Sequence, residues 1–182
     1  DWNWAAINGT KVVAANGATA FKMGGLYNLV ATEGTNLFAN GGTPRALTKA
    51  LIEDSLATAL DNGMDMENGA FLVKSTMKQK INELYGNAIE SITEAGVNLV
   101  VVHTVAGMIR FVMDSAASAT QLAIVDLSMA QPVVLPAKGG VMVMEPLAKV
   151  GAADRFQVYS QVSVDFGSAK GHIVISDINI AL

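Results

Sequence analysis

The chain of 182 residues contains no cysteine and only two histidines, so it has few of the side chains that usually bind transition metals. Without cysteine, no disulfide and no thiolate ligand can form. His103 and His172 each stand at the end of an apolar run, and neither has a second histidine or a carboxylate at ligand spacing. We expect both to be hydrogen-bonded residues at strand ends, with no metal site and no cofactor.

Charged residues and long apolar runs are also scarce. Only 15% of the residues are charged, the net charge is −4 and the pI is near 5.1, which argues against reading nucleic acid through a basic face. Hydrophobic residues make up 51% of the chain, yet no stretch approaches the ~18 uninterrupted apolar residues of a membrane helix. We expect a folded protein with no membrane partner, whose extra apolar surface is buried against other subunits.

The first 42 residues specify regular structure only weakly. The opening Asp1-Trp-Asn-Trp resembles neither a signal peptide nor a transit peptide, and the absence of a first Met suggests either a processed product or a trimmed chain. Gly, Ala, Asn and Thr dominate the following residues, with turn signals at several Asn-Gly pairs. The short apolar pieces Val12-Val13 and 26–30 are interpreted as strands added to a sheet built elsewhere.

Helix signals become clear after Pro44. Residues 48–61 carry an apolar stripe between a Thr48 cap and a stop at Asn62-Gly63, with Leu47 and Ile52 placed as a hydrophobic staple. A second helix is predicted from a capping box at Thr76-x-x-Gln79 to Gly86. A third, shorter helix is predicted over 88–95, with Gly96 as its stop.

Strand signals follow in the second half. The predicted strands cover 71–73, 97–104, 108–113 and 121–127, and the second and third of these form a hairpin through Ala106-Gly107. Residues 97–104 are β-branched and nearly all apolar, as in a strand covered on both faces. Pro132 and Pro136 bracket an extended piece that cannot be central to a sheet.

The chain is organised around its end, from Glu145 to Ile180. Residues 156–166 alternate between apolar and polar side chains, which indicates one long half-buried strand of roughly 36 Å at ~3.3 Å per residue. A corner of small residues at 167–171 then leads to a second predicted strand over 172–180. Such a long strand favours a role as a spine or as a strand between subunits.

Possible catalytic and ion-binding motifs are weak. Ser75-x-x-Lys78 has the nucleophile spacing of penicillin-binding enzymes, but no Ser-Asp-Asn or Lys-Thr-Gly partner occurs, so a helix cap explains it better. The acidic segment 61–69 lacks the ligand order of a calcium loop. A Ser-His-Asp triad of distant residues stays open. From the residues alone, we interpret the chain as a non-catalytic α+β protein.

The order of elements resembles the major capsid proteins of tailed bacteriophages, which have the Hong Kong 97-type fold. The resemblance runs over about 20–180 and rests on several short segments. The segments are Met23-Gly-Gly-Leu26, Ala46-Leu-Thr48, 71–81, Leu122-Ala-Ile-Val-Asp126, Leu147-Ala-Lys-Val-Gly151 and Ala169-Lys-Gly-His172.

This resemblance implies an α+β Hong Kong 97-like fold with an axial domain and part of a peripheral domain that contains the long β-strand. By the resemblance, 46–151 and 169–182 are the axial domain, 152–168 is the long strand of the peripheral domain, and 1–45 is a partial peripheral or connecting region. Family members usually carry an N-terminal arm, an extended loop and a spine helix, and no segment before Asp1 is available to match them.

The resemblance also implies a function and partners. We expect a non-enzymatic major capsid subunit of a virion, assembled in the bacterial host cytoplasm into hexameric and pentameric capsomers of an icosahedral shell that encloses DNA. Decoration, portal and scaffolding proteins are further expected partners. The alternatives are an encapsulin-like compartment shell and a serine hydrolase using Ser75 and Lys78. No catalytic, cofactor-binding or metal-binding residue is assigned.

Overall fold

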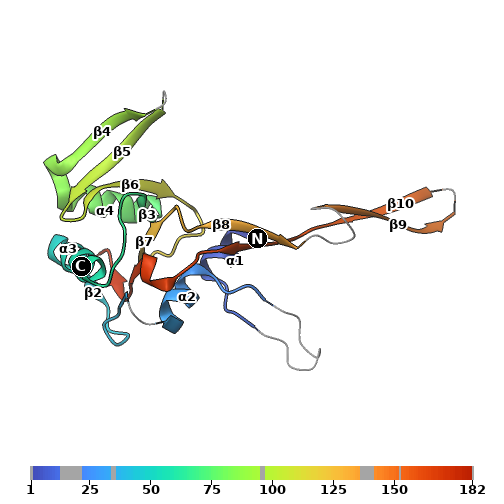
Figure 1. Cartoon of the computed structure of the whole chain (residues 1–182), viewed down its shortest axis with the longest axis horizontal. Coiled ribbons are helices and arrows are strands. Elements are labelled where there is room, and N and C mark those ends of the chain that lie inside the picture. The colour runs from blue at the N-terminus through green and yellow to red at the C-terminus, as the bar shows by residue number, and fades with distance from the viewer. Residues whose placement is uncertain are drawn as a thin grey trace.

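The computed structural model describes residues 2–12, 22–33, 36–94, 97–135, 142–151 and 153–181. Helices lie on both faces of a seven-stranded sheet, and together they form what we call the body (Figure 1). Two further strand pairs extend from the body as a narrow projection, which we call the ribbon (Figure 1).

The sheet of the body is mixed, with strand order β1-β12-β7-β3-β6-β5-β4. β7 pairs with β12 and β3 in antiparallel fashion, whereas β3 and β6 are parallel. All residues of β7 and β12 are buried, because these central strands are covered on both faces. The strands are β1 (Leu37–Phe38), β3 (Gly69–Val73), β4 (Ile89–Glu94), β5 (Val97–Thr104), β6 (Gly107–Met113), β7 (Leu122–Asp126) and β12 (His172–Ile175).

One face of the sheet is covered by α3 (Lys49–Asp61) and α4 (Ser75–Tyr85). The Thr48 hydroxyl accepts the Leu51 amide at 3.2 Å, and Gly63 ends α3 at a φ of +88°, so both predicted ends of this helix are confirmed. Leu47 and Ile52 are fully buried in one cluster, as a staple requires. The cluster also contains Phe71, whose ring stacks on that of Phe111.

The start of α4 differs from the prediction. The helix begins at Ser75, with Lys74 as its N-cap and no capping hydrogen bond from a side chain, so the capping box at Thr76 is wrong. Only Lys74 separates the end of β3 at Val73 from the start of α4 at Ser75, and this one-residue connection determines where the helix begins. The predicted end at Gly86 is confirmed, since Gly86 has a φ of +46°.

The opposite face of the sheet is partly covered by α1 (Trp2–Asn8) and α2 (Leu26–Glu33). The predicted strand at 26–30 is therefore wrong. Leu26 and Val30, one helical turn apart, are both fully buried against the sheet. The apolar segment 26–30 is too short for its hydrophobic periodicity to distinguish a helix from a strand, so this tertiary contact determines that it is helical. Gly25 allows the close approach of α1 and α2, because a Cβ there would lie 2.6 Å from the Gly9 nitrogen.

The predicted third helix at 88–95 is also wrong. A single 3-10 turn at Gly86–Ala88 leads into β4, which pairs in antiparallel register with β5 from Ile89↔Val102 to Glu94↔Val97. The β-branched strand β5 offers β4 a complete ladder of backbone hydrogen bonds, and this outweighs the local helix preference. The predicted stop at Gly96 lies outside the described residues. The β5–β6 hairpin is confirmed, with Gly107 at a φ of +103°.

The C-terminal run, predicted as one strand over 172–180, is interrupted. After β12, Asp177 adopts a φ of +61° and β13 (Ile178–Asn179) pairs with β2 (Arg45–Ala46). The Asp177 carboxylate accepts the amides of Asn40 and Gly42 at 2.7 and 3.0 Å, which keeps the pKa of this carboxyl below its usual value. These hydrogen bonds attach the turn before β2 to the end of the chain.

The ribbon consists of β8 (Gln131–Leu135), β9 (Val143–Val150), β10 (Ala153–Tyr159) and β11 (Gln161–Asp165). The single long strand predicted over 156–166 is wrong in its continuity, because Ser160 interrupts it and its two parts have different partners. β11 pairs with β8, and β10 pairs with β9. The expectation for the piece between Pro132 and Pro136 is confirmed as far as it is described, since β8 stays outside the main sheet. No helix in the described ranges is long and apolar enough to cross a membrane.

Candidate assembly surface

The outer half of the ribbon presents an apolar face. In the antiparallel register of β9 and β10, Phe156 lies opposite Pro146 and Val158 lies opposite Met144. Residues directly opposite each other project to the same side of a two-stranded sheet. Phe156 is 57% exposed and Val158 is 62% exposed, and Met144 and Pro146 are exposed as well. Four neighbouring apolar side chains therefore share one uncovered face, which we call the ribbon face.

The same alternation continues toward the body, but there it becomes buried. Val162 is partly exposed, whereas Val164 and Phe166 pack toward α1 and α2, and Phe166 joins the hydrophobic cluster of Leu26 and Val30. One apolar stripe thus begins in the core and ends in solvent. A two-stranded ribbon is marginally stable in water by itself, so an uncovered apolar face on it is typical of an interaction surface.

The corner between ribbon and body is held by His172. Its Nε2 lies 2.6 Å from the carbonyl oxygen of Phe166, to which it donates, and the two rings pack edge to face. The buried Nδ1 has no hydrogen-bond partner in the part of the chain that the structure describes. Burial lowers the pKa of His172, opposed by the Phe166 hydrogen bond and the nearby Asp126 carboxylate. The expectation that His172 is a hydrogen-bonded residue is confirmed.

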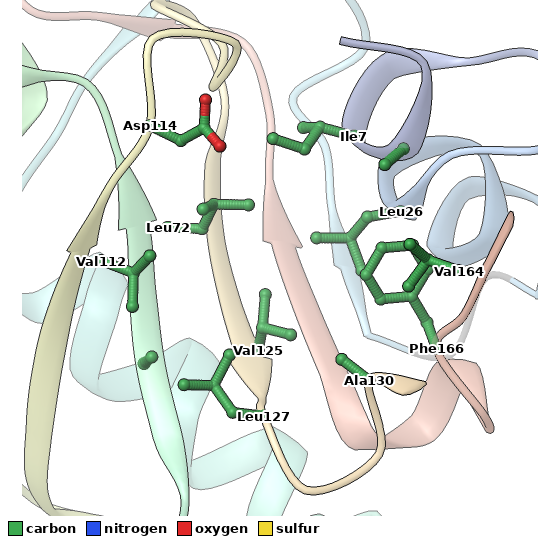
Figure 2. A pocket seen from close by; sticks show the side chains of 12 residues that line it. Ile7, Leu26, Leu72, Val112, Asp114, Val125, Leu127, Ala130, Val164 and Phe166 are labelled. Carbon is green, nitrogen blue, oxygen red and sulfur yellow. The ribbon is translucent and has the colours of Figure 1, made fainter. Parts of the chain in front are cut away.

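A cavity of about 350 Å³ lies beside this corner, between the sheet and the two N-terminal helices. Figure 2 shows Leu72, Val112 and Val125 of the sheet on one side and Leu26 and Phe166 on the other. The cavity is almost entirely apolar. Among the described residues that line it, Asp114 is the one that carries a charge; it lies at one end of the view, and its Oδ1 accepts the Ala116 amide at 2.7 Å. We call this space the sheet pocket.

The structure does not assemble the enzyme motif considered above. Ser75 is the exposed first residue of α4, and the Lys78 ammonium lies 5.3 Å from the centre of the Phe111 ring rather than on the Ser75 hydroxyl. His103 Nε2 lies 3.0 Å from a Glu90 carboxylate oxygen on the exposed β4–β5 hairpin. Neither histidine is hydrogen-bonded to a serine in the described part of the chain.

The acidic segment 61–69 forms an ordinary connection between α3 and β3. Asp65 accepts the Glu67 amide at 3.0 Å, which is a local turn contact. Among the described residues, no three His, Asp or Glu side chains gather closely enough to hold a metal ion.

Two features were missed in the sequence. Glu53 accepts both the Tyr85 hydroxyl and the Val105 amide at 2.7 Å, and so joins α3, α4 and the β5–β6 turn. No local signal identifies such a contact between residues 32 and 52 positions apart. The strand β9 was also missed. Gly151, at a φ of +70°, marks the turn between β9 and β10 and was the available signal.

The described residues form a mixed-sheet body with a long projecting ribbon (Figure 1). The structure is similar to a protein of the holo-SrpI encapsulin complex from Synechococcus elongatus PCC 7942, solved by cryo-electron microscopy. The TM-score is 0.57 at 12% sequence identity, and the match covers 87% of this chain and 58% of that one. At this identity the likeness shows the fold, which is the Hong Kong 97-like fold expected above.

The chain belongs to the SU10 major capsid protein family, whose model matches residues 1–179. The family is one of structural proteins, and membership supports the interpretation of this chain as a capsid shell subunit. The chain spans somewhat more than half the length of the encapsulin chain it resembles. A comparison with curated proteins finds no match.

Proposed function

We propose that this chain is a major capsid subunit whose copies associate into the icosahedral shell of a bacteriophage, enclosing DNA without reading its sequence. The observation that carries the proposal, beyond family membership, is the uncovered ribbon face on a strand pair too thin to bury it. Burial of apolar surface contributes about 25 cal/mol per Å². Contact with further copies is the simplest way to remove Phe156, Val158 and Met144 from water.

The proposal also assigns the residues of the subunit to two domains. Residues 46–151 and 169–182 would form the axial domain around the capsomer centre, and 152–168 with part of 1–45 would be peripheral. This division assigns β9 to the axial domain and β10 to the peripheral domain, although the two strands pair with each other in the ribbon. Hexameric and pentameric capsomers, with decoration, portal and scaffolding proteins as partners, complete the proposed assembly in the host cytoplasm.

Electron microscopy and sedimentation velocity test the proposal. The chain should be expressed within its complete gene product, so that any preceding segment is present. Closed shells, capsomers or tubes are expected. A preparation that remains monomeric at high concentration and moderate salt would contradict the proposal.

A compartment shell that packages enzymes is the second candidate, because the similar solved structure is an encapsulin complex. The two functions differ in their contents. Particles purified from the native source should contain DNA if the first proposal holds, whereas a co-purifying protein cargo without DNA would favour the second. Nuclease-protected DNA and mass spectrometry of the particle contents distinguish them.

A further inference from the structure

We propose that Asn40 is a site of spontaneous deamidation, at which the Gly41 nitrogen attacks the side-chain amide of Asn40. Glycine favours this reaction, because it has no side chain to hinder the attack and its backbone turns freely. The Asn-Gly pair occurs five times in the chain, at Asn8, Asn16, Asn40, Asn62 and Asn68. The pair at Asn16 lies outside the described residues, and the other four differ in how the glycine nitrogen is bonded.

Three of the four described glycine nitrogens donate a hydrogen bond to the main chain. The donors and acceptors are Gly9 to the Ala5 carbonyl at 2.9 Å, Gly63 to the Leu60 carbonyl at 2.9 Å, and Gly69 to the Met66 carbonyl at 3.0 Å. The first two bonds close the ends of α1 and α3, and the third lies at the start of β3. Each of these nitrogens must break its hydrogen bond before it can attack the preceding side chain.

Gly41 is the exception. In the described part of the chain its amide has no hydrogen-bond acceptor, and a Cβ added to it would meet no atom within 4 Å. Asn40 and Gly41 are both exposed, in the turn before β2, where Gly41 has a φ of +62°. The Asn40 Nδ2 donates to the Thr43 carbonyl at 2.8 Å within the same turn. Rotation of one exposed side chain therefore brings the amide carbon to the glycine nitrogen, and water has free access.

The reaction needs water and no other co-reactant. The Gly41 nitrogen loses its proton and forms a bond to Cγ of Asn40, while the bond from Cγ to Nδ2 breaks and ammonia leaves with the proton. The resulting succinimide ring then adds water at either of its two carbonyl carbons. Addition at Cγ restores the main chain and gives aspartate, whereas addition at the main-chain carbonyl gives isoaspartate.

Either product alters the contact that holds this turn. The Asp177 carboxylate accepts the amides of Asn40 and Gly42 at 2.7 and 3.0 Å. Deamidation places a second carboxylate on residue 40, and like charges at such short range repel each other. Isoaspartate also lengthens the main chain by one methylene between residue 40 and Gly41. The attachment of the turn to the end of the chain is therefore weaker after the reaction.

Peptide mapping by mass spectrometry during incubation at mildly alkaline pH tests the proposal, with the other Asn-Gly pairs as internal controls. We expect Asn40 to deamidate roughly five- to tenfold faster than Asn8, Asn62 and Asn68, because each of those reactions must first break a backbone hydrogen bond. In urea, where the chain is unfolded, the four rates should become alike. Equal rates in the folded chain, or a reaction at another described pair that outruns Asn40, would overturn the proposal.

Two variants separate the reaction from its consequence. Asn40→Gln keeps a side-chain amide but requires a larger ring, so we expect it to lose the rapid reaction while its circular dichroism stays unchanged. Asn40→Asp carries the charge of the product, and we expect hydrogen exchange at the Gly42 amide to accelerate by roughly fivefold. Rapid deamidation in Asn40→Gln would overturn the attack by Gly41, and unchanged exchange in Asn40→Asp would overturn the weakened attachment.

Discussion

β7 in the body and β10 in the ribbon are both strands rich in apolar side chains, but their surroundings differ. Every residue of β7 is buried between α3 on one face of the sheet and the α1–α2 pair on the other. In β10, by contrast, Phe156 and Val158 face solvent, because β9 is the one strand paired with β10 among the described residues. The difference shows that an apolar strand is part of the hydrophobic core only where other layers of the fold cover it. Where nothing covers it, its apolar side chains form an exposed surface that can serve as an interface.

The largest test of this comparison is a truncation in the body. Phe71→Ala removes a fully buried ring that stacks on Phe111, so we expect the free energy of unfolding to fall by about 3–5 kcal/mol. Urea denaturation followed by circular dichroism measures this change. Phe156→Ala, the same substitution in the ribbon, should change the unfolding free energy of the isolated chain by less than about 0.5 kcal/mol. If both substitutions lowered the unfolding free energy equally, Phe156 would contribute to the fold as Phe71 does, and the ribbon would not differ from the body in this respect.

The second test concerns association rather than folding. Val158→Ser removes an apolar side chain from the ribbon face, and we expect association between copies to weaken by about 10- to 100-fold, as burying such a side chain contributes ~1.5–3 kcal/mol. Val105, also 62% exposed but in the body, provides the matched control Val105→Ser. Sedimentation velocity over a range of concentrations measures both. If the two variants associate equally well, the ribbon face is not the assembly surface.

Within the body, Glu53 tests whether one carboxylate fixes the β5–β6 hairpin to the helices. Burial, reinforced by Glu53, raises the pKa of Tyr85, so its hydroxyl stays protonated and donates to the carboxylate. Glu53→Ala leaves this hydroxyl and the Val105 amide without their acceptor, with an expected loss of about 1–3 kcal/mol in unfolding free energy. Glu83→Ala, at an exposed position of α4, should cost less than about 0.5 kcal/mol. A loss no greater than that of the control would show that the contact is not stabilising.

The smallest expected effect is a pH dependence of stability caused by His172, at the corner between the body and the ribbon. Burial lowers the pKa of His172 in the folded chain, so the unfolded chain binds a proton first as the pH falls. Stability is then full above the ordinary histidine pKa of ~6.5 and declines below it, by at most about 1.4 kcal/mol per pH unit for one proton. The lowered pKa of Asp177 adds a separate decline only at more acidic pH, below its usual carboxyl range.

Denaturation at several pH values between 7 and 5 measures this decline. His172→Gln should flatten it, whereas His103→Gln, at the exposed pair with Glu90, should leave it in place. A decline that persists unchanged in His172→Gln would assign the proton uptake to another group.

The sequence by itself determined the elements whose signals are local. Thr48 and Asn62-Gly63 fixed both ends of α3, because a cap acts through hydrogen bonds within one turn. The alternation at 156–166 correctly indicated extended structure with one apolar side, because side chains of a strand alternate whatever it pairs with. The hairpin of β5 and β6 and the buried strand β7 were also predictable from periodicity and turn residues.

Only the tertiary structure decided which distant segments met. Leu26–Glu33 became a helix by packing on β12, and Ile89–Glu94 became a strand by pairing with β5. The apolar stripe of the ribbon is buried at Phe166 and exposed at Phe156, although both positions obey the same alternation. Periodicity shows which side chains share a face, but burial depends on what covers that face, and α2, which helps to cover Phe166, lies more than 100 positions away in the chain.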